Sequence, residues 1–288
     1  MKVAFAMIVF NGDMFLKQVL QSIYPYASQI VISEGTVKYW ADKGFTTSTD
    51  DTNKILSEFP DPEKKISVVH GTYAEKSELC QAYMPFVKQD TDYLWTIDSD
   101  EVFKETDIVK VFQLLESRQP ASVGFQSNTF FGGTSHILTG FERDHSFKRV
   151  LKFAPGCKYS EHRPPTLSSE IGEVINGKKL FELTGVEMYH YSYLSPKQVC
   201  EKIQYYKESL SKDNCIDNYF KEIWLKWVLG DTETRNAIEG KYNGVHEFQP
   251  GYRGECRTTP FNGTHPKSIA DSIGEINQKF NQQLKAYV

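Results

Sequence analysis

The stretch YLWTIDSDE, residues 93–101, decides the fold that this sequence predicts. Its first part, YLWTI, is a run that is typical of a strand buried on both faces of a sheet. The run ends abruptly in the acidic segment Asp98-Ser99-Asp100-Glu101. Since ligands of open α/β sheets bind outside the carboxyl ends of the strands, this pattern predicts a parallel sheet with an acidic carboxyl edge.

Three strand–helix units precede this stretch. In the first helix, Leu16, Val19, Leu20 and Ile23 recur at the spacing of one apolar stripe. We predict strands over 2–10, 29–33 and 65–70, and helices over 16–23, 51–59, 75–88 and 105–117. This alternation predicts the α/β class, with a doubly wound, mostly parallel sheet flanked by helices.

The second half of the chain changes character. We predict strands over 121–131, 147–153 and 185–193, a charged turn over 161–165, and helices from Ser195-Pro196 onward. No repeat or low-complexity linker separates these parts. We therefore expect a core over residues 1–194 and a helical C-terminal extension over residues 195–288 that packs on it.

Composition narrows the classes of protein further. The chain has 288 residues, 40% of them hydrophobic, and a formal net charge of -4 without a block of like charge. Nucleic acid is therefore not indicated as a partner. A local basic groove that binds nucleic acid is the alternative. No run reaches the roughly 18 apolar residues of a membrane helix, so no transmembrane segment is expected. Five cysteines without zinc-site spacing indicate reduced thiols in a cytoplasmic protein.

The acidic segment predicts a cation site. Asp98 and Asp100 are two residues apart at a strand end, so both carboxylates can reach one hard cation. Mg²⁺ and Mn²⁺ take one or two protein carboxylates together with substrate phosphates. Such a cation would offset the charge of a leaving diphosphate. The alternative is a solvated acidic turn that binds no metal.

The order of the motifs resembles that of the GT-A fold glycosyltransferases of the family 2 type. The similar segments are AMIVFNG (6–12), FLKQVLQSI (15–23), ISEG (32–35), IDSDE (97–101) and MYHYSY (188–193), the last followed by the Lys-rich helix KQVCEKIQYYK (197–207). The resemblance covers residues 1–210. It implies a GT-A-type sheet and transfer of a sugar from a nucleotide-sugar donor, by default UDP-linked, to a hydroxyl of a glycan or another acceptor.

The resemblance also implies roles for single residues. It places the nucleotide-sugar against Phe10, Asn11, Glu34, Lys76, Asp98 and Ser99. It places the metal, Mn²⁺ or Mg²⁺, on Asp98, Asp100 and His190. Glu34 departs from the aspartate that is commoner after the second strand. An imidazole ligand suits Mn²⁺ better than Mg²⁺, and the alternative for His190 is a histidine packed among tyrosines.

The catalytic base is expected beyond the metal motif. An inverting transfer, which the resemblance implies, needs a carboxylate or a histidine to take the proton of the acceptor hydroxyl. Glu142 and Asp144 are the candidates, and Glu161-His162 offers two further groups. The alternative is that Glu142 and Asp144 are surface charges.

Two other assignments stay open. Arg149, on the predicted strand 147–153, would either face phosphates or belong to the polar face of an edge strand. At the level of function, a nucleotidyltransferase that makes nucleotide sugars, or a non-catalytic sugar-binding protein, could share this sheet. The segment after the first strand, Asn11-Gly12-Asp13, is not the Gly-rich basic loop that cradles a triphosphate, which disfavours the nucleotidyltransferase.

Overall fold

A computed structural model describes the chain except for residues 163, 169–170, 210–217, 243–244 and 246–253. The chain divides into two compact units. The first comprises Met1–Gln126, Ser146–Met188 and Pro266–Ile269, and the second Ser127–His145, Tyr189–His265 and Ala270–Val288. Each unit contains a hydrophobic core cluster of its own.

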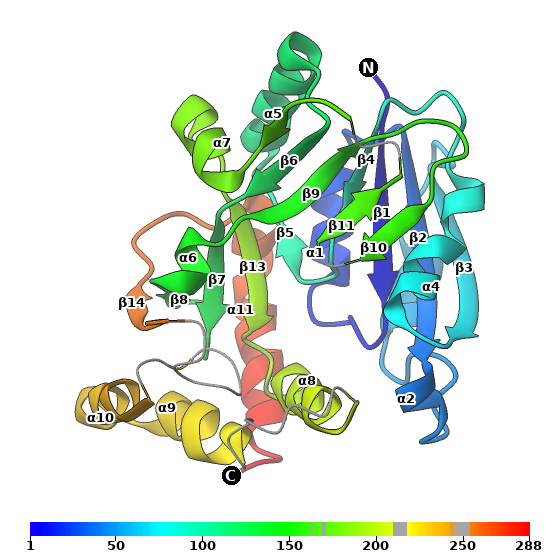
Figure 1. The fold of residues 1–288 in the computed structure, drawn as a ribbon. Helices are drawn as coiled ribbons and strands as arrows, with labels where there is room; N and C mark the ends of the chain where they lie inside the picture. Colours follow the sequence, from blue (N-terminus) through cyan, green and yellow to red (C-terminus); the bar gives the residue numbers. More distant parts are fainter. Residues whose placement is uncertain (163, 169–170, 210–217, 243–244, 246–253) are drawn as a thin grey trace. The chain divides into compact units, whose positions relative to one another are not determined.

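A seven-stranded sheet forms the first unit (Figure 1). Its order is β12-β6-β9-β4-β1-β2-β3. The strands are β1 (Val3–Val9), β2 (Gln29–Val37), β3 (Ile66–Tyr73), β4 (Tyr93–Thr96), β6 (Ser122–Phe125), β9 (Phe147–Lys152) and β12 (Val174–Ile175). Strands β1 to β4 are parallel, and β9 runs antiparallel between β4 and β6. The predicted α/β class with a mostly parallel sheet is thus confirmed.

The chain reverses its direction of winding at β1. From β1 it passes to β2 and then to β3 on one side, whereas β4 pairs with the other side of β1. The helices of this unit are α1 (Leu16–Ile23), α2 (Lys38–Ala41), α3 (Thr52–Glu58), α4 (Lys76–Ala82), α5 (Glu105–Arg118) and α7 (Gly177–Thr184), with the short 3₁₀ helix η1 (Met84–Phe86). The carboxyl ends of β1 and β4 therefore border the topological switch point, where open α/β sheets bind their ligands.

Aromatic packing around Trp95 holds β4 in the middle of the sheet. Its ring stacks on Phe5 of β1 at 5.1 Å and on Phe125 of β6 at 5.4 Å between ring centroids, and it contacts Phe103 edge-on at 4.9 Å. All four side chains are buried. Because Trp95 lies three residues before Asp98, this packing fixes the strand from which the acidic segment emerges.

Several predicted boundaries are wrong. β2 continues past Glu34-Gly35, where the sequence predicted its end, because Gly35 lies against the backbone of Gly71 in β3: a Cβ on Gly35 would come within 1.9 Å of the Gly71 oxygen. The predicted helix 75–88 ends at Ala82 and is followed by η1. Of the predicted charged turn 161–165, Glu161 and His162 end strand β10 (Tyr159–His162) and Pro165 begins β11 (Pro165–Leu167), its antiparallel partner, while residue 163 lies outside the described residues.

The second unit combines strands with most of the C-terminal helices. Its strands β14 (Thr258–Pro260), β8 (His136–Leu138), β7 (Ser127–Phe131) and β13 (Met188–Tyr193) lie side by side in this order, and the two-residue strand β5 (Glu101–Val102) belongs to the first unit. The helices are α6 (Phe141–Asp144), α8 (Pro196–Ser209), the π-helix η2 (Phe220–Leu225), α9 (Lys226–Leu229), α10 (Thr232–Tyr242) and α11 (Lys267–Leu284), whose first residues belong to the first unit.

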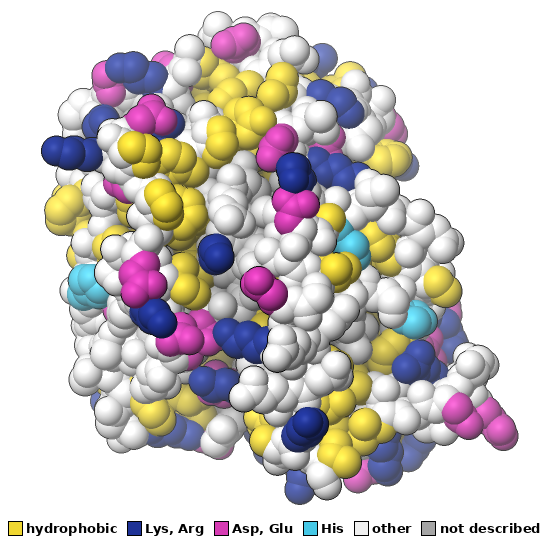
Figure 2. Space-filling model, turned by 180° about the vertical axis from the view of Figure 1, so that it is seen from behind, with side chains coloured by type: hydrophobic (Ala, Val, Ile, Leu, Met, Phe, Trp, Pro, Cys, Tyr) yellow, Lys and Arg dark blue, Asp and Glu magenta, His cyan; other side chains and the backbone are white. Residues whose placement is uncertain are grey.

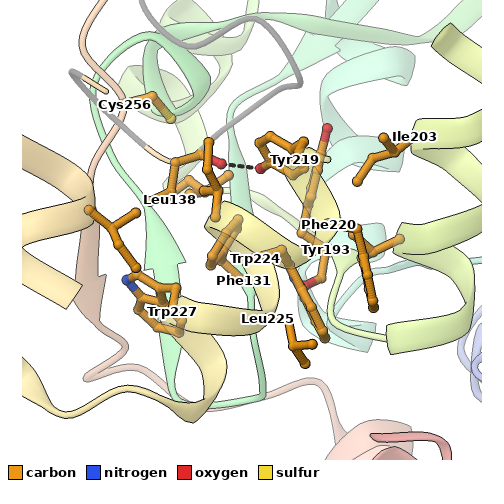
Figure 3. Packing of buried hydrophobic residues seen from close by; sticks show 14 residues of the cluster. Phe131, Leu138, Tyr193, Ile203, Tyr219, Phe220, Trp224, Leu225, Trp227 and Cys256 are labelled. Atoms are coloured by element: carbon orange, nitrogen blue, oxygen red, sulfur yellow. Dashed lines mark hydrogen bonds between the residues drawn. The ribbon is translucent and has the colours of Figure 1, made fainter. Parts of the chain in front are cut away.

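The core of the second unit is built from large aromatic side chains (Figure 3). Trp224 stacks on Phe220 at 5.3 Å and donates its indole hydrogen to the Tyr193 carbonyl at 2.9 Å. Trp227 donates to the buried Glu239 carboxylate at 2.8 Å, so its polar atom is satisfied inside the core. The expected division into a core over 1–194 and an extension over 195–288 stays a prediction.

Acidic and basic side chains are interspersed on the face seen in Figure 2. This distribution agrees with the small formal net charge of -4. Among the described residues, no helix has the length and apolar character needed to cross a membrane.

Candidate nucleotide-sugar site

Three loops meet at the carboxyl edge of the sheet in the first unit: residues 10–14 after β1, 45–51 after α2, and 97–100 after β4. Gly12 sits where the first and third loops touch. A Cβ on Gly12 would lie 2.8 Å from the Ser99 hydroxyl oxygen and 2.6 Å from Val9 Cγ2. Glycine at this position therefore allows the first loop to approach the acidic segment, at the switch point between β1 and β4.

Asn11 joins the first loop to the second. Its backbone is left-handed, with φ 53°, a conformation that asparagine adopts more readily than most residues. The side-chain oxygen accepts a hydrogen bond from Thr49 N at 2.9 Å, and the backbone N–H donates to Ser48 Oγ at 3.0 Å. Gly12 N also donates to Thr52 Oγ1 at 2.8 Å. The predicted nucleotide-binding residue Asn11 thus organises this edge through its own hydrogen bonds.

The acidic segment closes on itself as a tight turn. Glu101 N donates to the Asp98 carbonyl at 3.0 Å, and Asp98 N donates to Glu101 Oε2 at 3.1 Å. Glu101 is fully buried, Asp100 is buried, and the Asp98 side chain is about half exposed, at 47%. The three carboxylates therefore differ in access to solvent: Asp98 is the most exposed of them.

Arg149 of β9 holds this turn. Its Nε donates to both carboxylate oxygens of Glu101, at 2.8 and 3.0 Å, and its Nη2 lies 3.3 Å from Asp98 Oδ2. Burial opposes the charge of this guanidinium, but Glu101, Asp98 and Asp100 outweigh burial, and the pKa of Arg149 is raised. The guanidinium thus offsets part of the negative charge that three neighbouring carboxylates create.

The sequence did not reveal this role of Arg149. Of the two alternatives for Arg149, the polar face of an edge strand is wrong, because β9 lies inside the sheet between β4 and β6. The side chain faces Glu101 and Asp98. A buried acid such as Glu101 needs a cationic partner. The burial of Glu101 is visible only in the structure, so the sequence alone did not indicate this pair.

The donor set bears on the metal prediction. Among the residues that the structure describes, no three His, Cys, Asp or Glu side chains are grouped as around a metal ion. Two neighbouring carboxylates, Asp98 and Asp100, nevertheless match the number that Mg²⁺ takes from a protein when phosphates supply further ligands. The residues therefore fit a cation that is bound together with a diphosphate. The three-residue set that includes His190 stays a prediction.

Glu34 is buried at the end of the parallel part of β2 that pairs with β1. Its carboxylate accepts from Ser48 N at 2.7 Å and from the Thr47 hydroxyl at 3.0 Å, and His70 Nδ1 lies 2.9 Å from Oε2. Burial raises the pKa of Glu34, but the hydrogen bonds from His70, Ser48 and Thr47 outweigh it, so the pKa is lowered. Glu34 is thus an ionised anchor for the second loop.

Two further predicted residues lie in the first unit. The half-buried Phe10 ring is 5.6 Å from Trp40 of α2, and Trp40 contacts Phe45 at 6.1 Å. Lys76 is the first residue of α4 and is half-buried. Their predicted contacts with a nucleotide-sugar stay predictions.

The remaining predicted residues belong to the second unit. His190 is a half-buried residue of β13. In α6, Glu142 is buried and accepts a hydrogen bond from Thr129 Oγ1 at 3.0 Å, whereas Asp144 is exposed at the end of the helix. The Asp144 carboxylate is thus the more exposed to solvent of the two, and the roles of both as candidate bases stay predictions.

An aromatic cluster in the second unit was not predicted as such. Phe130 stacks on Tyr191 at 4.5 Å, and the Tyr191 hydroxyl lies 2.9 Å from His265 Nδ1. Phe261 contacts Phe130 edge-on at 5.0 Å. Phe261 and His265 are therefore held against β7 and β13 by contacts between rings.

No protein-family model matches the sequence, and no curated protein matches it significantly. Among solved structures, the chain is similar to S. aureus TarS 1-349, with 10% identity over 85% of this chain and 83% of that one and a TM-score of 0.41. The chain spans 36% of the same protein in its complex with UDP-GlcNAc, with 12% identity over 46% of this chain and a TM-score of 0.36.

The glucosyl-3-phosphoglycerate synthase of Mycobacterium tuberculosis, in complex with Mn²⁺ and UDP-glucose, is similar over 45% of this chain and 44% of that one, with 17% identity and a TM-score of 0.31. The α/β fold of this chain stands on its own sheet topology.

Proposed function

We propose that this chain is a glycosyltransferase that takes a sugar from a UDP-linked donor and passes it to an acceptor hydroxyl, with a divalent cation at Asp98 and Asp100. One observation carries the proposal. The acidic turn lies at the switch point of a doubly wound sheet, in contact with the loop after β1 and clamped by Arg149. The carboxylates of Asp98, which Arg149 contacts, and of Asp100, two residues later in the same turn, suit a diphosphate and its cation at that point.

The chain's own residues would divide the work. Asp100 and Asp98 would hold Mn²⁺ or Mg²⁺, which supplies charge neutralisation for the leaving diphosphate when bound. Arg149 keeps Asp98 in place, and Gly12 lets the first loop lie beside Ser99. Asp144, or Glu142, would accept the proton of the acceptor hydroxyl as that oxygen attacks the anomeric carbon, which implies inversion.

A thermal-shift screen tests the proposal. Donor binding to the native state raises the unfolding temperature by linkage, so UDP-sugars with Mn²⁺ should raise it more than either component alone. Asp100→Asn should abolish this synergy and lower donor turnover by at least about a hundredfold. Asp92→Asn is a matched control, because Asp92 lies just before the opposite end of β4 and accepts from Lys2 N. Full turnover in Asp100→Asn would refute the assignment.

The His190 ligand is tested separately. His190→Ala should shift the manganese titration of donor turnover to higher concentration while leaving the UDP affinity without metal unchanged. An unaltered titration would remove His190 from the site. The two candidate bases are compared through the variants Asp144→Asn and Glu142→Gln. The variant that lacks the catalytic base should have a lower kcat and nearly unchanged donor affinity.

A further inference from the structure

His70 presents an exposed imidazole at the carboxyl edge of the sheet. It lies on the edge strand β3, opposite Glu34 in the parallel register. Its side chain is 61% exposed, while the Glu34 carboxylate 2.9 Å from Nδ1 is fully buried. Because the Nδ1 edge of the ring faces this buried partner, the opposite edge, which carries Nε2, is the exposed one.

The environment of Glu34 selects the tautomer of the neutral His70 ring. The carboxylate accepts from Ser48 N and from the Thr47 hydroxyl as well as facing His70. An ionised carboxylate is an acceptor only, so the hydrogen between it and His70 belongs to Nδ1. In the neutral imidazole the exposed Nε2 is then a hydrogen-bond acceptor.

The position of His70 suits a nucleotide laid along the edge. In the order β3-β2-β1-β4, His70 on β3 is three strand spacings, about 14 Å across the sheet, from β4, after which the acidic turn begins. Between them, Ser48 joins β2 to the loop after β1, because its backbone N–H donates to Glu34 and its hydroxyl oxygen accepts from Asn11 N. A nucleoside diphosphate with its phosphates at Asp98 and Asp100 can extend its base toward His70.

We propose that His70 reads the nucleobase of the donor, with Nε2 accepting the N3–H of uracil, and that Glu34 acts through His70 as a positioning residue. The inference rests on the proposed function. Uracil offers a donor at N3, whereas cytosine has an acceptor there and would place two lone pairs face to face. The arrangement therefore selects uridine over cytidine nucleotides, and Glu34 serves the base indirectly.

Isothermal titration of UDP and CDP, with Mn²⁺ present, tests the inference. The wild-type chain should bind UDP at least about tenfold more tightly than CDP. His70→Ala should lower the affinity for UDP about tenfold and leave the affinity for CDP unchanged. His70→Asn distinguishes a loss of base recognition from a loss of stability. The asparagine amide can still donate to Glu34 but has no atom at the position of Nε2. This variant should lose the preference for UDP and keep the thermal stability. Ser67→Ala, on the same strand, is the control.

The outcomes distinguish the two proposals. If the wild-type chain binds UDP but His70→Asn keeps the full preference over CDP, the reading role is wrong and the proposed function stands. An equal loss for UDP and CDP in both His70 variants also contradicts the reading role. Guanine also offers an N–H donor, which His70 Nε2 could accept. GDP binding as tight as UDP binding would therefore contradict the assignment of this site to uracil. Binding of no nucleotide would refute the proposed function and this inference together.

Discussion

At the scale of single residues, Glu34 couples the stability of the first unit to pH. Burial raises the pKa of Glu34, but hydrogen bonds to the ionised form outweigh burial, so its folded-state pKa lies below the ordinary value of a glutamate. A lowered pKa contributes stability that is fully present above the unfolded pKa and is lost as the pH falls through the folded one. Glu34→Gln should therefore lower the free energy of unfolding at pH 7 but flatten its dependence on pH below about 4.5. Urea titrations from pH 3 to 7 measure this, and parallel pH curves for the variant and the wild type would contradict it.

Residue identity explains which parts of the site the sequence could predict. The acids Asp98 and Asp100 follow an apolar strand, so their place at the edge of the sheet could be predicted from neighbours in the sequence. Glu34 was also placed at this edge, but its hydrogen bonds reach Ser48 and His70, far away along the chain. Such long-range partners leave no periodic pattern, so the sequence did not predict that this carboxylate is anchored by Ser48 and His70. The predicted contact of Glu34 with a nucleotide stays a prediction.

At the scale of elements, the ion pair between Glu101 and Arg149 joins the acidic turn to β9. Removing one partner of a buried pair leaves an uncompensated charge and costs about 3–5 kcal/mol, so Arg149→Met should destabilise the first unit strongly. The double variant Glu101→Leu/Arg149→Met should recover most of that stability, because an apolar pair of similar volume often replaces a buried ion pair. Donor turnover should stay low in the double variant, since Asp98 has lost its guanidinium partner. Turnover that returns together with stability would show that Arg149 only supports the fold.

For helices and strands too, the features set by neighbouring residues could be predicted from the sequence, whereas those set by contacts between distant segments could not. The apolar stripe of α1 is confirmed, because all four of its predicted residues are buried. The ends of β2 and β3 were predicted too early, since the contact of Gly35 with Gly71 lets the two strands remain paired up to Val37 and Tyr73. A close approach between two glycines depends on the pairing of the strands and is not visible in either segment alone.

At the scale of the whole molecule, the residues proposed for the nucleotide all lie in the first unit, whereas the aromatic core of Figure 3 lies in the second. Ile223 is fully buried in that core. Ile223→Ala should lower the free energy of unfolding by about 2–5 kcal/mol, through lost burial and a residual cavity. The affinity for UDP without metal, measured by titration at a temperature where the variant is folded, should be unchanged, because no proposed contact with the nucleotide depends on this side chain. Ile223→Val, which removes a single methylene group, is the graded control and should cost about 0.5–1.5 kcal/mol. A fall in UDP affinity that tracks the loss of stability across the two variants would mean that the nucleotide also depends on the second unit.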